Sequence, residues 1–292
     1  MRLQELVTLH TKENILAEAT TIKYHSVVSI FIKDTNINLV SSIDHETILN
    51  WRDNILNRSS AGNWNNYHRH LRALLQTAIK FKVIKENPFI KVKSITHYPD
   101  KKYLLSELEV QNLLAFCDNI KHGWFWSCVI TTLKYTGIRR RQLVGLTWSD
   151  FDLDNRCLIL RVITSKTKRE YIVPINQQVI DSILLVRQKT MHLNTDQNKN
   201  NQIFNVTLIN SRYFADNMNE GHVARFFVKT SKTLNLRVSA HRFRHTFATK
   251  LANNTQTNIK TVQNLLGHSS VHTTLGYVHP DMSDMRKAIN LL

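Results

Sequence analysis

The sequence predicts a mainly α-helical protein with one small antiparallel β-sheet, divided into a helical N-terminal domain and a mixed α/β C-terminal domain. Three observations support this prediction. Apolar residues recur at helical spacing along most of the 292 residues. A single pair of apolar, β-branched runs flanks a polar turn, so one hairpin is expected. A basic stretch that contains a proline interrupts the helical pattern near residue 100.

The first hundred residues carry helical patterns throughout. Asp44 is placed as the N-cap of a helix that bears Ile48 and Trp51 on its apolar face. A longer helix starts at about Trp64. Its apolar face is formed by Trp64, Tyr67, Leu71, Leu74, Leu75 and Ala78. We expect a helical domain over residues 1–96.

The opposite face of this longer helix is basic and carries Arg69, Arg72 and Lys80. Such a face is usually a solvated surface stripe. However, residues 1–63 hold six basic and seven acidic side chains, whereas residues 64–100 hold seven basic and two acidic ones. This local excess of positive charge favours contact with the DNA backbone.

The pair Asn87-Pro88 ends the helical region. We place the domain linker at residues 97–103, in the basic stretch that follows. Ser106 and Glu109 then form a capping-box pair ahead of apolar residues at helical spacing. A second domain is therefore expected over residues 104–292.

The second domain begins with helices and contains the predicted hairpin. Its two strands are residues 157–163 and 170–175. Further helices are predicted at residues 177–191, 222–234, 242–252 and 258–266. Gly267 is placed to close the last of these. A short apolar stripe could pack on its own domain or on a neighbouring protomer, and it consists of Met282, Met285, Ile289 and Leu292.

Composition limits the possible functions. The chain has 39 Lys and Arg against 22 Asp and Glu, a net charge of +17, which implies a polyanionic partner. A hydrophobic content of 42% excludes disorder of the whole chain. The sequence has neither a signal-peptide core nor an apolar run near the roughly 18 residues that span a bilayer. We therefore expect a cytoplasmic, nucleoid-associated protein that has no membrane partner.

Three clusters could carry chemistry, and each has a plainer interpretation. Gly137 follows an apolar helix, so Arg139 and nearby backbone N–H groups could bind an anion, although a run of arginines is more often a solvated face. His241 and His245 lie four residues apart and could bind zinc, but Arg242 replaces the glutamate of zinc proteases and adds positive charge. Both histidines could equally be core residues.

A third cluster joins Gly267 and His268 to Tyr277, and a lone tyrosine is normally a core residue. The order of the three clusters is more specific. Thr-Gly-Ile-Arg139, Lys166 in the hairpin, His241-x-x-Arg244-His245, Leu-Gly-His268 and then Tyr277 resemble the signature of the tyrosine recombinases, the family of phage integrases and Xer-type resolvases. The resemblance covers residues 104–285, and the preceding residues resemble the core-binding domain of that family.

This resemblance implies a role for each of six residues. Tyr277 would be the nucleophile, and Arg139 and Arg244 would grip the scissile phosphate. Lys166 would protonate the leaving 5′-oxygen, while His241 would assist proton transfer and His268 would hydrogen-bond the phosphate. The implied reaction cleaves and rejoins duplex DNA through a 3′-phosphotyrosyl link, with no cofactor, no metal and no ATP.

The family resemblance also implies a homotetramer acting on two specific recombination sites in double-stranded DNA. Position 142 is commonly Glu in the family and is Gln142 here, which removes a negative charge beside Arg139. Two alternatives remain open at this point. A type IB topoisomerase would share the chemistry but relax DNA as a monomer, and a non-catalytic DNA-binding protein would retain only the fold.

Overall fold

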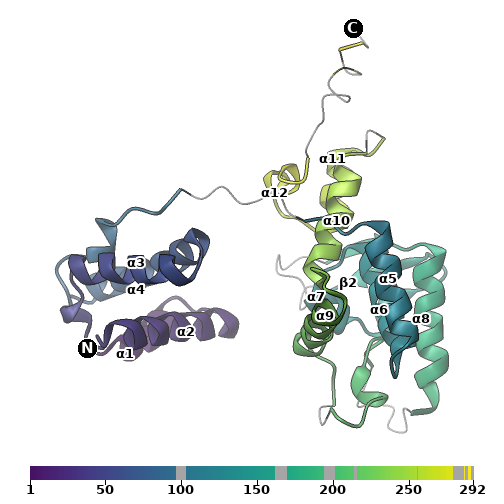
Figure 1. Cartoon of the computed structure of the whole chain (residues 1–292), viewed down its shortest axis with the longest axis horizontal. Helices are drawn as coiled ribbons and strands as arrows, with labels where there is room; N and C mark the ends of the chain where they lie inside the picture. Colours follow the sequence, from purple (N-terminus) through teal and green to yellow (C-terminus); the bar gives the residue numbers. More distant parts are fainter. Residues whose placement is uncertain are drawn as a thin grey trace. The chain divides into compact units, whose positions relative to one another are not determined.

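The computed structural model describes residues 1–96, 103–161, 170–193, 201–213, 216–254, 256–278, 286, 289 and 290. The chain divides into two compact units, Met1–Asp100 and Lys101–Leu292, and each is described by itself below (Figure 1). Helices dominate both units, and the described part of the chain holds one three-stranded antiparallel sheet. The predicted fold class is confirmed.

The first unit is all helical. Its helices are α1 (Leu3–Glu13), α2 (Glu18–Thr35), α3 (His45–Arg58) and α4 (Ala61–Lys80), with 3₁₀ turns at Val40–Ser42 and Pro88–Ile90. Buried aromatic rings hold them together, because Trp51 lies 5.0 Å from Phe31 and 5.6 Å from Trp64 between ring centroids. Asp44 caps α3 as predicted, accepting from the Thr47 N–H at 2.7 Å. Helix α4 begins before the predicted Trp64 because Ser60 is its N-cap.

The second unit contains the remaining elements. Its helices are α5 (Glu107–Asp118), α6 (Gly123–Thr136), α7 (Arg140–Gly145), α8 (Gln177–Thr190), α9 (Glu220–Leu234), α10 (Ala240–Ala252), α11 (Ile259–Leu266) and α12 (Val271–Leu275). Short 3₁₀ turns lie at Trp148–Asp150, Met191–Leu193 and Val206–Leu208. The strands are β1 (Phe151–Asp152), β2 (Cys157–Leu160) and β3 (Tyr171–Pro174).

Helix α6 forms the centre of this unit and packs against α5, α8 and α10. Its side chains Phe125, Val129 and Leu133 are fully buried. The predicted hairpin is confirmed in its described part, since β2 pairs antiparallel with β3 and Leu158 lies opposite Val173. Strand β1, which was not predicted, pairs with β2 on its other side.

Two helix ends matter for the site, and one of them differs from the prediction. Helix α10 starts at Ala240 because Ser239 caps it, so His241 lies in its first turn. Helix α11 ends at Gly267 as predicted, with a left-handed φ of 58°. Nearly all of the predicted apolar stripe at residues 282–292 and of the predicted linker at residues 97–103 lies outside the described residues. No helix in the described ranges is long and apolar enough to cross a membrane.

Candidate active site

The turn after α6 places Arg139. Gly137 adopts a left-handed φ of 60°, and a Cβ there would lie 2.3 Å from a ring carbon of Phe247. The tight turn buries Ile138 and leaves Arg139 as the N-cap of α7. The backbone N–H of Arg139 donates to Oε1 of Gln142 at 2.9 Å. The backbone of Arg139 is therefore held at a helix start by the turn at Gly137 and by the buried amide of Gln142.

Arg244 reaches the same place from α10, and its guanidinium is buried. It donates through Nη1 to the Gly137 carbonyl at 2.9 Å and through Nη2 to the Leu266 carbonyl at 2.7 Å. Nη1 of Arg139 lies 3.5 Å from that same Leu266 carbonyl oxygen. The two guanidinium groups therefore meet at one backbone oxygen, although their residues are far apart in the sequence.

The electrostatics of this arginine pair are unusual. Burial, followed by the nearby charge of Arg139, lowers the pKa of Arg244 to about 10, which still leaves it cationic at neutral pH. Its hydrogen-bond partners among the described residues are two carbonyls, one imidazole and the Tyr171 hydroxyl, and none is a carboxylate. Two adjacent cations without a described counter-ion form a site that favours an anion.

His268 supports Arg244 as a neutral ring. Its Nε2 lies 2.9 Å from Nη2 of Arg244, and because a guanidinium only donates, Nε2 must accept. The proton of the neutral ring then lies on Nδ1, which is 2.9 Å from Oγ1 of the buried Thr274. Burial, followed by the charges of Arg244 and Arg139, lowers the pKa of His268 to about 4. The fold thus selects one tautomer of this histidine.

Tyr277 lies just beyond α12 and is 8% exposed. Its ring stacks on that of His268, with centroids 6.0 Å apart and an interplanar angle of 12°. The centroid of the Tyr277 ring also lies 5.2 Å from the centroid of the His245 ring. The tyrosine is therefore packed against a histidine that contacts the arginine pair.

His241 and His245 form a hydrogen-bonded pair on α10. Their Nε2 atoms are 2.8 Å apart and their rings are nearly perpendicular. Within the described ranges, no group of three or more His, Cys, Asp or Glu side chains is placed to hold a metal ion. The zinc interpretation of this pair therefore has no described third ligand in its support.

Sequence reasoning missed one contributor to the site. The hydroxyl of Tyr171, on β3, accepts from Nε2 of Gln142 at 2.9 Å and approaches the Leu266 carbonyl at 3.5 Å. The same ring would clash with a Cβ on Gly267 at 2.3 Å. Nothing in the local sequence marks Tyr171, because its role depends on the sheet edge meeting the end of α11.

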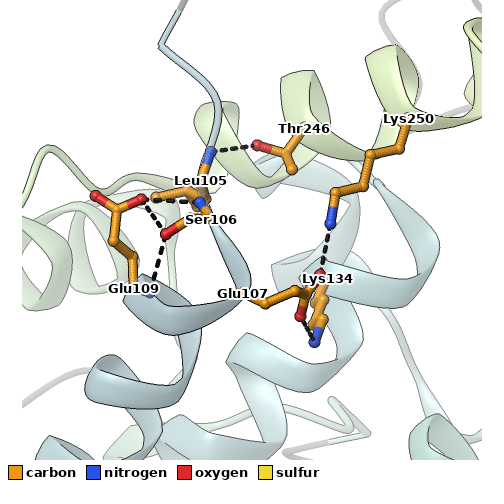
Figure 2. A network of polar contacts seen from close by, with 7 residues as sticks. All are labelled: Leu105, Ser106, Glu107, Glu109, Lys134, Thr246 and Lys250. Carbon is orange, nitrogen blue, oxygen red and sulfur yellow. Dashed lines mark hydrogen bonds and ion pairs between the residues drawn. The ribbon is translucent and has the colours of Figure 1, made fainter.

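Figure 2 shows contacts that tie the start of α5 to α6 and α10. The carboxylate of Glu107 pairs with Lys134 on α6 at 2.7 Å and with Lys250 on α10. These hydrogen bonds, first that of Lys134, lower the pKa of Glu107 to about 2. The Leu105 N–H also donates to the buried Thr246 hydroxyl at 2.9 Å. The exposed ion pairs add little stability, so the buried bond is the stronger link to the helix that bears Arg244.

The other predicted site residues lie elsewhere. Lys166 lies outside the described residues. Arg69 and Arg72 are exposed on α4, and the Lys80 ammonium pairs with Glu13. Of the arginines next to Arg139, Arg140 pairs with Glu220 at 3.0 Å and Arg141 is exposed. Of the six predicted catalytic residues, the structure describes five and brings all five into one region, namely Arg139, His241, Arg244, His268 and Tyr277.

Known proteins resemble this chain in sequence and in fold. A protein of Pseudomonas syringae described as a tyrosine recombinase XerC is 30% identical over 307 aligned residues, which cover 99% of this chain and 64% of that protein. The tyrosine recombinase XerC of Listeria innocua is 29% identical over 72% of this chain. The chain thus spans somewhat less than two thirds of the length of the first of these relatives.

Solved structures show the same fold. The integrase of transposon Tn1549, in complex with transposon right end DNA, superposes with a TM-score of 0.77 at 22% identity over 99% of each chain. A lambda integrase tetramer bound to a Holliday junction gives a TM-score of 0.72 at 18% identity, over 92% of this chain and 78% of that chain. The phage integrase family profile matches residues 104–284, most of this chain. The protein therefore belongs to the phage integrase family of tyrosine recombinases.

Proposed function

We propose that this protein is a site-specific recombinase that cleaves and rejoins duplex DNA through a transient 3′-phosphotyrosyl link, without metal or ATP. One observation carries the proposal. Arg139 and Arg244 converge on the Leu266 carbonyl beside Tyr277, and no carboxylate of the described residues pairs with Arg244. A phosphodiester is the anion that this arrangement fits, since each guanidinium can donate to its non-bridging oxygens.

The arginine pair supplies the electrostatic part of catalysis. Attack on phosphorus builds negative charge on the non-bridging oxygens, and fixed cations in a water-poor site stabilise that charge. Losing one such donor typically raises the barrier by about 3 kcal/mol. Arg244 is already buried and oriented by hydrogen bonds, so little reorganisation is needed when the phosphate binds.

Covalent chemistry falls to Tyr277 and Lys166. The Tyr277 oxygen forms a bond to phosphorus while the bond from phosphorus to the 5′-oxygen breaks, and the leaving oxygen takes a proton from Lys166. A neutral phenol is a weak nucleophile, so its proton must pass to a nearby base as the oxygen attacks, and His241 assists that transfer. Rejoining reverses these steps, because the phosphotyrosine retains the energy of the broken ester.

His268 has a supporting role in this proposal. Its Nε2 accepts from Arg244 and its ring stacks on Tyr277, so it links the phosphate-binding group to the nucleophile. The expected hydrogen bond from His268 to the phosphate would need a proton on Nε2. The low pKa of this ring makes orientation of Arg244 its first task.

The nucleophile is tested by comparing wild type with Tyr277→Phe on labelled duplex fragments cut from the DNA that flanks the gene. Both proteins should shift the DNA in a gel, and only wild type should leave an adduct that survives SDS. Equal adduct formation would falsify the nucleophile assignment. Relaxation of arbitrary supercoiled plasmid by monomer would favour a type IB topoisomerase, and binding without any adduct would favour a non-catalytic DNA-binding protein.

The basic face of α4 is proposed as a second DNA contact. Arg69 and Arg72 are exposed there. The Lys80 ammonium is paired with Glu13, which offsets its positive charge. Arg69→Ala or Arg72→Ala should weaken DNA binding and reduce the slope of log K against log salt by about 0.9 for each lost phosphate contact. Lys12→Ala, on α1, is the matched control, and an unchanged slope in all three would make the face a solvated stripe.

Assembly follows the resemblance. We propose a homotetramer acting on two specific DNA sites, since a lambda integrase of the same fold is seen as a tetramer on a Holliday junction. Association with the nucleoid would follow from DNA binding and from the net charge of +17. Sedimentation of the protein with and without paired sites tests the assembly, which should appear only with DNA.

A further inference from the structure

Tyr171 reaches the arginine pair from the β-sheet, and the proposed chemistry gives it no role. Its hydroxyl accepts a hydrogen bond from Nε2 of Gln142 at 2.9 Å. The same hydroxyl is hydrogen-bonded to the guanidinium of Arg244. It also lies 3.5 Å from the Leu266 carbonyl oxygen, which both arginines approach. One hydroxyl on β3 therefore contacts groups from α7, α10 and α11.

The directions of these hydrogen bonds follow from the two ends of the chain that they form. The backbone N–H of Arg139 and the guanidinium of Arg244 can only donate. Oε1 of Gln142 therefore accepts from Arg139, and the Tyr171 oxygen accepts from Arg244. Between these ends, Nε2 of Gln142 donates to the Tyr171 oxygen. The hydrogen bonds thus run without a break from Arg139 to Arg244, and no carboxylate takes part.

The position of the Tyr171 ring does not depend on these hydrogen bonds. Its backbone pairs with Leu160 of β2, and its ring packs against the main hydrophobic core of the second unit. A Cβ on Gly267 would lie 2.3 Å from a ring carbon, so the end of α11 lies directly against the ring. Removing the hydroxyl alone should therefore leave the ring in place and release only the groups bonded to it.

The guanidinium groups depend more on their hydrogen bonds. An arginine side chain has many rotamers, and holding it in one of them costs conformational entropy. Arg244 is held by two carbonyls, His268 and Tyr171. The backbone N–H of Arg139 is bonded to a buried amide whose other end is bonded to Tyr171. Loss of the hydroxyl should therefore widen the range of orientations that the arginine pair adopts.

We propose that Tyr171 is a positioning residue whose hydroxyl aligns the two phosphate-binding arginines, Arg244 directly and Arg139 through Gln142. The proposal rests on the proposed role of these arginines in binding the scissile phosphate. It accounts for how the pair is aligned where no carboxylate of the described residues pairs with it.

The test compares two Tyr→Phe variants, each of which removes a hydroxyl and keeps the ring. Tyr171→Phe removes the proposed contact. Tyr213→Phe is the matched control, because Tyr213 is also half-buried against the same core and its hydroxyl makes no hydrogen bond within the described part of the chain. Single-turnover adduct formation is followed on the flanking-DNA fragments, with a nick beside the cleavage position that lets the cut strand leave.

The rate constant should fall about tenfold in Tyr171→Phe, as for a lost hydrogen bond to a charged group, and stay within about twofold in Tyr213→Phe. The final yield of adduct and the Kd for DNA should not change in either variant. This split separates positioning from folding. A variant that only loses folded protein forms less adduct at an unchanged rate constant, whereas misaligned arginines slow every molecule.

A spectroscopic measurement reads the arginines without any reaction. In the full-length protein labelled with ¹⁵N-arginine, the guanidinium signals of Arg244 and the backbone N–H signal of Arg139 report on the two ends of the chain. Arg244→Lys and Arg139→Lys assign them. In Tyr171→Phe, the Arg244 signals should broaden as its N–C bonds rotate more freely, and the Arg139 N–H signal should shift. Tyr213→Phe should leave both unchanged.

Three outcomes would overturn the proposal. A rate constant in Tyr171→Phe equal to that in Tyr213→Phe would show that the hydroxyl is not needed. A loss of yield at an unchanged rate constant would assign Tyr171 to folding alone. Unchanged arginine signals in Tyr171→Phe would show that the pair is aligned without it. If wild type forms no adduct, the proposed function fails, while the ¹⁵N spectra still decide whether Tyr171 aligns the arginines.

Discussion

Two hydrophobic clusters of the second unit hold different halves of the candidate site. The large cluster runs through α5, α6, α8 and α9 and includes Ile138 and Leu143 on either side of Arg139, together with Phe243 next to Arg244. The small cluster contains, among the described residues, Ala248, Val262, Leu266 and Tyr277 as its buried members. The arginines are thus anchored by a large core, and the tyrosine is held by a small one.

This difference has a mechanical consequence. Local unfolding is cheapest where few apolar contacts are buried, so α11 and α12 should open more readily than α6. Guanidinium groups that bind a phosphate benefit from rigidity because their N–H donors must stay aligned. A nucleophile that becomes bonded to DNA and is later released benefits from a segment that can shift without disturbing these guanidinium groups.

The largest effect on the free energy of unfolding should come from truncating one buried side chain in either cluster. Phe125→Ala in the large cluster should lower the free energy of unfolding by about 3–5 kcal/mol, as for a buried aromatic ring. Leu266→Ala in the small cluster removes a fully buried side chain but leaves the carbonyl that both arginines approach. Its cost of about 2–5 kcal/mol should appear mainly as faster amide exchange in α11 and α12.

Urea unfolding and hydrogen exchange on both variants check this comparison. Faster exchange in α6 and α8 of the Leu266→Ala variant, equal to that in α11, would show that the two clusters unfold as one unit. The arginine pair would then be held no more rigidly than Tyr277.

A smaller effect should appear with pH. Burial and then the nearby arginines lower the pKa of His268 from its usual 6.5 to about 4. Between these values the unfolded chain binds a proton that the folded chain does not, so the free energy of unfolding decreases as pH falls from 6.5 toward 4 and is highest above 6.5. His268→Gln keeps an acceptor for Arg244 and does not titrate. It should therefore lose less stability than wild type over this range.

Urea midpoints at several pH values, taken as the difference between wild type and His268→Gln, isolate this histidine from the other histidines that titrate. Identical pH profiles would contradict the assignment of a neutral His268 between Arg244 and Tyr277.

The smallest effect is expected for Gln142→Glu. Gln142 is fully buried, with Oε1 accepting from the Arg139 N–H and Nε2 donating to the Tyr171 hydroxyl. A glutamate can accept at both places because the Tyr171 hydroxyl can reverse its hydrogen bond, and its charge lies beside Arg139. Adduct formation should stay within about tenfold of wild type, or 1.4 kcal/mol of barrier. A larger loss would show that the amide is required at this end of the large cluster.

Much of the fold could be predicted because its signals are local. Asp44 and the Ser106–Glu109 pair cap helices as their spacing indicates, and Gly267 closes α11 with a positive φ. Strand β1 was missed because two residues carry no periodicity. The start of α10 was placed late because the capping effect of Ser239 shows only in the folded backbone.

The candidate site likewise has a part that the sequence predicts and a part that only the structure shows. Motif order identified Arg139, His241, Arg244, His268 and Tyr277, and the structure places them in one region. The contacts of Tyr171, the shared Leu266 carbonyl and the bond between His241 and His245 involve packing or backbone atoms that the sequence does not display. Lys80 was grouped with Arg69 and Arg72 by helical spacing, and its pairing with Glu13 depends on how α1 packs on α4.

The sequence by itself determined which chemical groups this protein carries, where most of its helices lie, and which family it resembles, because those properties depend on residue type and short spacing. Only the tertiary structure decided that two distant guanidinium groups share one carbonyl, that His268 is neutral with its proton on Nδ1, and that His245 faces both His241 and Tyr277. Protonation, tautomer and alignment depend on burial and on neighbours from other elements, and these exist only once the chain has folded.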